Sequence, residues 1–233
     1  EGRRPPPLTT SPAPRTAMPS RYAQVAFTPN VRRHQEAHSS RRAYARMEQG
    51  PEEADPLGPG EIAFIAERDS FYLASIGETG WPYVQHRGGP PGFLHALDPG
   101  TLAFVDFRGN RQYITVGNLD HDDRVSLLLM DYLAQTRLKI YGRARAVDPP
   151  EADDLMARLY PAGVRSPAER LITVEVEAYD WNCPQHITRR YTAEEVERAV
   201  EPLWRRVERL ESENAALRGD APASAPPPPP AKQ

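Results

Sequence analysis

The sequence is poor in the features that mark secreted, membrane and nucleic-acid-binding proteins. Its 233 residues include one cysteine, Cys183, which excludes an internal disulfide and fits a reducing cytoplasm. No apolar run approaches the roughly 20 residues that cross a bilayer. Twenty-nine basic and 32 acidic residues give a net charge of −3, so no excess positive charge attracts nucleic acid. We therefore expect a cytoplasmic protein whose partners include neither nucleic acid nor a membrane.

Familiar catalytic and metal-binding signatures are also missing. The sequence has no Walker A loop, no G-x-G-x-x-G, no G-x-S-x-G and no H-E-x-x-H motif. Cys183 and His186 have the spacing of a zinc half-site but lack a second pair, and His34 and His38 lack a third ligand. No metal site is predicted, and a Cys183–His186 dyad remains an alternative to a structural role.

Composition divides the chain into four parts. Residues 1–21 and 219–233 are rich in proline and are predicted to be disordered, because such segments bury too little apolar surface to offset the entropy of ordering. Residues 22–192 are predicted to form the globular domain. Residues 193–218 are predicted to form a separate C-terminal helix.

The globular part is predicted to be mainly β, with short helices (α+β). Turn residues separate short apolar or alternating segments, which we interpret as strands at 70–76, 81–87, 93–97, 101–107, 124–132, 137–147 and 171–181. Helical patterns cover 31–50, 60–68, 111–119 and 150–159. Mostly hairpin connections indicate an antiparallel barrel of about six strands.

The C-terminal segment has the pattern of an amphipathic, coiled-coil-like helix. Thr192 and Glu195 form a capping box at its start. The heptad a positions are Ala193, Val200, Val207 and Asn214, and the d positions are Val196, Leu203, Leu210 and Leu217. Pro202 is expected to kink this helix or to start a second one. Two interpretations remain open: a dimer seam with Asn214 fixing its register, or a helix lying on its own barrel.

The segment Thr101–Tyr113 contains the clearest candidate site. An apolar strand ends in Gly109, which permits a tight bend, and Asn110, Arg111 and Gln112 follow at the expected first turn of a helix. Free amides and an arginine at a helix start can hold a phosphate. The alternative is an ordinary surface turn with an exposed arginine.

Two strand faces carry polar residues that suggest an anionic ligand nearby. Tyr83, Gln85 and Arg87 share one face, and the following Gly88 and Gly89 would let a flat ligand approach the backbone. A second face presents Arg137, Lys139, Tyr141 and Arg143. The alternative is that both faces are simply solvated.

Several separated motifs resemble one known family. The segments RDSFYLA (68–74), GWPYVQHRGG (80–89), FVDFRGNRQY (104–113) with GNL (117–119), and DWNCPQHI (180–187) resemble the pyridoxamine 5′-phosphate oxidase-like, FMN-binding split-barrel proteins. The resemblance covers about residues 27–192. It implies a six-stranded split barrel that forms a homodimer, with FMN held at the dimer interface.

The resemblance also suggests roles for individual residues. Arg111 resembles the phosphate-binding arginine, and Trp181 the residue that covers the cleft from a partner chain. Arg87 and Arg137 are candidates for the positive charge beside the flavin, and His186 for a proton-transfer group. The implied cofactor-binding set is Gln85, His86, Arg87, Gly88, Asp106, Asn110, Arg111, Gln112, Arg137 and Trp181.

The function implied is an FMN-dependent oxidoreductase that acts on a small, flat substrate, with a small molecule or a nicotinamide electron donor as its partner. The segment after Ile187 leads into the heptad helix instead of the oxidases' substrate-binding motif, so oxidation of pyridoxamine phosphate itself is not expected. One alternative is a non-catalytic flavin-nucleotide-binding or sensing module whose C-terminal helix recruits partners. A further alternative keeps the barrel but binds haem or deazaflavin.

Overall fold

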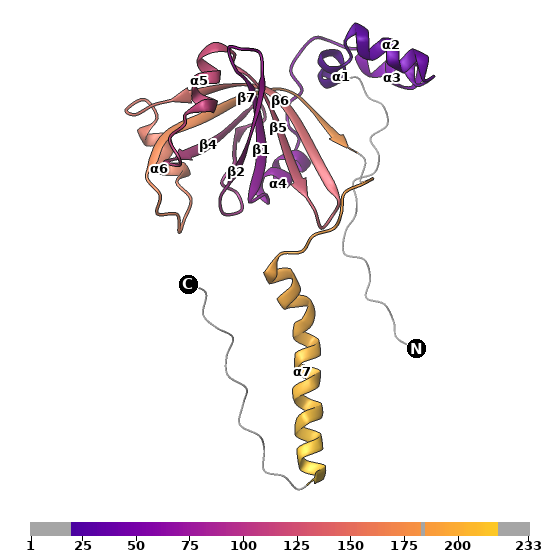
Figure 1. The fold of residues 1–233 in the computed structure, drawn as a ribbon, viewed down its shortest axis with the longest axis vertical. Helices are drawn as coiled ribbons and strands as arrows, with labels where there is room; N and C mark the ends of the chain where they lie inside the picture. Colours follow the sequence, from indigo (N-terminus) through magenta and orange to yellow (C-terminus); the bar gives the residue numbers. More distant parts are fainter. Residues whose placement is uncertain (1–19, 183–184, 219–233) are drawn as a thin grey trace. The chain divides into compact units, whose positions relative to one another are not determined.

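The computed structural model describes residues 20–182 and 185–218 (Figure 1). This part of the chain divides into two compact units between Arg189 and Arg190, and each is described by itself. Cys183 and the predicted tail at 219–233 lie outside the described residues, as does most of the tail at 1–21. Ser20 and Arg21 cap and begin the first helix.

The first unit is built on one antiparallel sheet, as the sequence predicts. Its strand order is β2-β1-β5-β6-β7-β4-β3, and Figure 1 shows the strands twisting strongly around a common centre. The strands are β1 (Ser70–Ile76), β2 (Pro82–Gly88), β3 (His95–Asp98), β4 (Thr101–Phe107), β5 (Arg124–Asp131), β6 (Thr136–Val147) and β7 (Ala168–Asn182).

The split-barrel fold class is confirmed, and the sheet has seven strands where a barrel of about six was expected. Each of the seven predicted strand segments corresponds to a strand, and the shortest is β3, predicted at 93–97 and found as a four-residue edge strand paired with β4. Its register shifts between Ala96 and Asp98, where the turn at Asp98–Gly100 interrupts regular pairing.

Short helices surround the sheet, and one long helix follows it. They are α1 (Arg21–Ala26), α2 (Pro29–Ala37), α3 (Arg41–Tyr44), the 3-10 helix η1 (Ala45–Glu48), α4 (Pro59–Ala66), α5 (Ile114–His121), α6 (Asp153–Leu159) and α7 (Ala193–Arg218). None of the helices in the described part of the chain is long and apolar enough to cross a membrane.

Two helix predictions need correction. The single helix expected over residues 31–50 is divided into three, because Ser39 adopts a left-handed backbone conformation (φ 58°) that a continuous helix cannot contain. The helix α7 instead runs without interruption through Pro202, so no second helix begins at Glu201.

The barrel interior is a continuous apolar core. Alternate residues of β1 point inward, and Phe71 contacts Phe93 and Phe104 with ring centroids 5.6 and 5.3 Å apart. A second cluster, including Val105, Met156 and Leu171, lies where α6 packs against β4 and β7. The helix α5 is held to β1 by a buried hydrogen bond from Asn118 Nδ2 to Ser75 Oγ (2.9 Å).

Gly142 marks the place where β6 and β7 come too close for a side chain. A Cβ atom there would lie 2.5 Å from the carbonyl oxygen of Glu175, at the register shift between Tyr141 and Gly142. We expect Gly142→Ala to lower the free energy of unfolding by about 1–3 kcal/mol, measured by urea denaturation. Gly60→Ala in α4, where a Cβ meets nothing within 4 Å, is the matched control and should be neutral or stabilising. Equal losses in both variants would contradict this packing argument.

Candidate functional site

Two strands that are not neighbours in the sheet are joined by a buried ion pair. Arg87 on β2 donates from Nη1 to Asp106 Oδ1 on β4 at 2.5 Å, and the two side chains are 14% and 11% exposed. The Arg87 guanidinium also lies 5.6 Å from the centre of the Phe104 ring. Because β2 is an edge strand and β4 lies next to the other edge, this contact fixes the distance between the two sides of the barrel.

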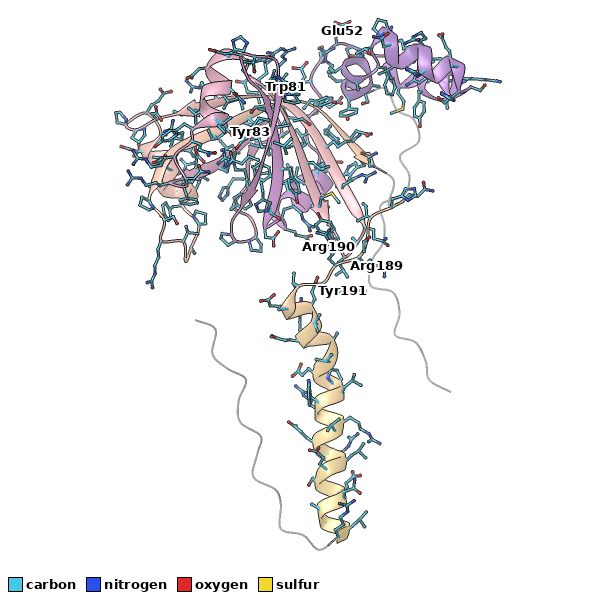
Figure 2. All side chains as sticks on the ribbon, viewed as in Figure 1. Glu52, Trp81, Tyr83, Arg189, Arg190 and Tyr191 are labelled. Carbon is cyan, nitrogen blue, oxygen red and sulfur yellow. The ribbon has the colours of Figure 1, made fainter. Side chains whose placement is uncertain are left out.

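A cleft of about 200 Å³ opens beside this ion pair. Tyr83, Gln85 and Arg87 reach it from one face of β2, as the alternating pattern predicts, and Figure 2 labels Tyr83 near the start of that strand. The remaining lining residues come from the end of β4, the following loop, the start of α5 and the start of β7: Asp106, Phe107, Gly109, Asn110, Arg111, Gln112, Tyr113, Ile114, Thr115, Val116 and Glu169.

The loop before α5 is built differently from the prediction. The helix begins at Ile114, so Asn110, Arg111 and Gln112 lie in the loop and not in the first helical turn. Arg111 (φ 62°) and Tyr113 (φ 53°) take the left-handed conformation that the sequence reading expected Gly109 to supply. Asn110 shapes the loop by accepting a hydrogen bond from the Gln112 amide on its side-chain oxygen (3.1 Å).

Arg111 is the exposed cation of this cleft. Its Nε donates to the Tyr113 hydroxyl at 3.4 Å, and this hydrogen bond raises the pKa of Arg111 further above its ordinary value. Tyr113 in turn donates to Glu169 Oε1 (3.3 Å), so the loop is held to the start of β7. The guanidinium therefore stays charged and faces solvent at the mouth of the cleft.

Arg170 is a second buried arginine that the sequence reading missed. It contacts Asp106 Oδ2 from Nε (3.9 Å) and Asp148 Oδ1 from Nη1 (3.2 Å). In the part of the chain that the structure describes, the Nε atoms of Arg87 and Arg170 are buried without a hydrogen-bond partner. Asp106 pairs with Arg170 across β4 and β7, a register between distant strands that no local pattern encodes, and the predicted strand began only at residue 171.

The structure separates the other predicted site residues from the cleft. His86 points to the opposite face of β2 and meets Tyr72 edge-on (5.6 Å). A Cβ on Gly88 would lie 3.1 Å from the His86 ring, and one on Gly89 only 2.6 Å from Phe93. On the side where a Cβ would stand, both glycines therefore lie against atoms of their own chain.

Arg137, Trp181 and His186 belong to the start of β6, the end of β7 and the loop that follows β7. Arg137 pairs with Asn182 at the end of β7, and His186 is exposed in the following loop. The Trp181 indole donates to Glu61 Oε1 (2.7 Å) and meets Phe64 edge-on. None of the three lines the cleft of the same chain.

The second polar strand face on β6 is not a pocket. Lys139 pairs with Asp180 (2.9 Å) and lies 4.6 Å from the centre of the Tyr22 ring. Tyr22 stacks on Tyr141 at 4.8 Å, and burial raises the pKa of Tyr141 to about 12. The helix α1 thus covers a face for which the sequence suggested an anionic ligand.

Comparison with known proteins identifies the family. Residues 62–183 match the pyridoxamine 5′-phosphate oxidase family, and the chain belongs to it. No match was found among curated proteins.

Several solved structures are similar to about half of the chain. HupZ of Group A Streptococcus is 13% identical, with a TM-score of 0.43, over 58% of this chain and 100% of that one. An FMN-binding protein from Syntrophomonas wolfei is 10% identical, with a TM-score of 0.41, over 52% and 81%. An F420 reductase is 20% identical, with a TM-score of 0.39, over 53% and 98%.

The Arg87–Asp106 pair gives a prediction for stability. Asp106→Asn leaves the buried Arg87 charge without its counterion, and we expect a loss of about 3 kcal/mol in the free energy of unfolding. The double variant Arg87→Met/Asp106→Leu removes both charges and should recover much of that loss. Glu151→Gln, which breaks the exposed Arg145–Glu151 pair, is the control and should leave stability unchanged. The pairing would be contradicted if the double variant lost as much free energy of unfolding as Arg87→Met and Asp106→Leu lose together when each is made alone.

Proposed function

We propose that the chain is an FMN-binding oxidoreductase whose cleft between β2, β4 and α5 holds the phosphate of the cofactor. The observation that carries the proposal is the placement of Arg111. It is exposed and lines the cleft together with Arg87, which pairs with Asp106. Arg170 makes a longer ion-pair contact with the same aspartate (3.9 Å). A phosphate dianion needs such positive groups, and the planar guanidinium suits its oxygens.

The chain's own groups would share the work of binding. Arg111 supplies the fork that pairs with phosphate oxygens, and the left-handed loop turns that side chain toward the cleft. Ile114, Thr115 and Val116 line the cleft at the first turn of α5, where backbone amides lack intrahelical partners and favour an anion. Thr115 also donates to Gln85 Oε1 (2.8 Å), which keeps α5 beside β2.

We further propose that the working protein is a homodimer. A cleft of about 200 Å³ is smaller than the roughly 300–1,000 Å³ typical of pockets for ligands of this size. Arg137, Trp181 and His186, which the family resemblance assigns to the cofactor, lie outside it. Both observations are explained if a second copy brings these residues to the cleft.

The reaction would then depend on the flavin and on the charge beside it. Bound FMN supplies hydride or electron transfer through its N5 atom. Arg87 is paired with Asp106, so Arg137 of a second copy is the better candidate for the positive charge beside the ring. His86 and Gly88 remain predicted contacts, and His186 a predicted proton-transfer group, for a small planar substrate or a nicotinamide donor.

A mutation tests the phosphate site. Removal of a hydrogen bond to a charged group should weaken FMN binding about 10- to 100-fold in Arg111→Ala, measured by fluorescence titration of FMN. Arg111→Lys keeps the positive charge but lacks the planar guanidinium that pairs with two oxygens. Its affinity for FMN should lie between those of the wild type and Arg111→Ala. Arg145→Ala, an exposed arginine on β6 paired with Glu151, is the control and should bind normally. Unchanged affinity in Arg111→Ala would place the phosphate elsewhere.

Spectroscopy tests cofactor and catalysis together. The purified protein, supplied with FMN, should show bound-flavin bands at about 370 and 450 nm. Anaerobic addition of NADH or NADPH should bleach the longer-wavelength band. Bound FMN that neither donor reduces would favour the non-catalytic sensing module, and a haem or deazaflavin spectrum would overturn the choice of cofactor.

A further inference from the structure

The second unit, residues 190–218, carries a surface that the proposed function does not use. The capping box at its start is formed, since the Glu195 amide donates to Thr192 Oγ1 (3.2 Å) and the Thr192 amide to Glu195 Oε2 (2.7 Å). The 26 residues of α7 include no buried residue, and Figure 2 shows its side chains projecting on every side. Leu203 and Leu217 are 65% and 86% exposed. The apolar a and d residues of α7 form a stripe along the helix. An exposed apolar stripe of this kind marks a surface that another protein segment covers.

We infer that α7 pairs with α7 of a second copy of this chain as a parallel, in-register two-stranded coiled coil. This inference does not depend on the proposed flavin chemistry. The central a positions are the β-branched Val200 and Val207, and the d positions after Val196 are all leucine. This combination of side chains favours a two-stranded parallel coiled coil over higher oligomers.

The charges that flank the stripe fit a parallel pair. In that arrangement each g residue faces the e residue five positions later on the second copy. Arg206 then faces Glu211, and Glu213 faces Arg218, so both charged pairs have opposite signs. In the described residues none of these four side chains enters an ion pair within its own helix. The third pair sets Ala199 against Trp204, a small residue beside a large one.

The same residues argue against an antiparallel pair. With the helices fully overlapped in opposite directions, Arg206 lies next to Arg206 of the second copy and Glu197 next to Glu211. Asn214 then faces Val196 and its amide is buried without a partner, which is unfavourable. In the parallel pair the two Asn214 side chains meet at one level and can hydrogen-bond to each other.

Pro202 is compatible with this pairing. It occupies a c position, which points away from the seam, and α7 continues through it. Arg205 and Glu201, which form an ion pair at 2.6 Å along one helix, likewise lie outside the seam at f and b positions. The outer face of α7 thus forms an ion pair within its own helix, whereas the a and d positions and the flanking e and g positions are available to contact the second copy.

Cysteine cross-linking in the full chain tests direction and register. In a Cys183→Ser background, Asn214→Cys places two thiols at one a–a level, and mild oxidation should give a disulfide-linked dimer on a non-reducing gel. Ser212→Cys lies two residues away at an f position that points outward, and should remain largely monomeric. Equal cross-linking of both variants, or of neither, would overturn the inference.

A charge exchange tests the flanking pairs in the Cys183→Ser/Asn214→Cys background. In glutathione buffer, the effective concentration of the two introduced thiols should fall at least tenfold in Arg206→Glu and return in Arg206→Glu/Glu211→Arg. Arg209→Glu makes the same charge change at an outward c position and should have no effect. No loss in Arg206→Glu, or no recovery in the double variant, would overturn the parallel register. FMN titration of the same variants measures cofactor binding independently, so a failure of the coiled-coil inference can be distinguished from a failure of the proposed function.

Discussion

The contact between Arg87 and Asp106 determines the geometry of the candidate site. These residues lie on opposite sides of an open sheet order, and their 2.5 Å ion pair joins β2 to β4 where no backbone pairing does. Burial of both groups makes the pair strongly interdependent, because either charge alone would be left in a poorly solvated place. The cleft lies beside this ion pair, between β2, the loop after β4 and the first turn of α5.

The shape of the cleft depends on this ion pair and on the hydrogen bonds that hold α5 and the preceding loop in place. Hydrogen bonds from Asn118 and Thr115 hold α5 against β1 and β2, so the start of the helix lies at the cleft beside the ion pair. Tyr113 and Glu169 hold the loop to β7, which leaves Arg111 as the exposed cation. Arg170 adds a second buried guanidinium on Asp106. The charges that line the cleft balance, because Arg87 and Arg111 face Asp106 and Glu169. The physical basis for assigning an anionic ligand is therefore the exposed Arg111 guanidinium, since the two carboxylates already pair with Arg87 and Arg108.

The sequence predicted the strands well because their signal is local. Alternation along β2 placed Tyr83, Gln85 and Arg87 on one face, and they line the cleft together. The pairing of Arg87 with Asp106 is a contact between distant strands, which no local pattern encodes. The same reason explains the missed Arg170 and the covered face of β6, where Tyr22 from α1 stacks on Tyr141. The left-handed Arg111 and Tyr113 escaped prediction because only glycine signals that conformation reliably.

The central claim is that the loop at Asn110–Gln112 holds the phosphate of FMN. A crystal structure of the protein grown with FMN tests this most directly. The account predicts phosphate oxygens within hydrogen-bond distance of the Arg111 guanidinium, with the flavin ring extending toward Arg137 of a second copy. A bound FMN whose phosphate lies on other residues, with the cleft beside Arg87 and Asp106 left open, would contradict it.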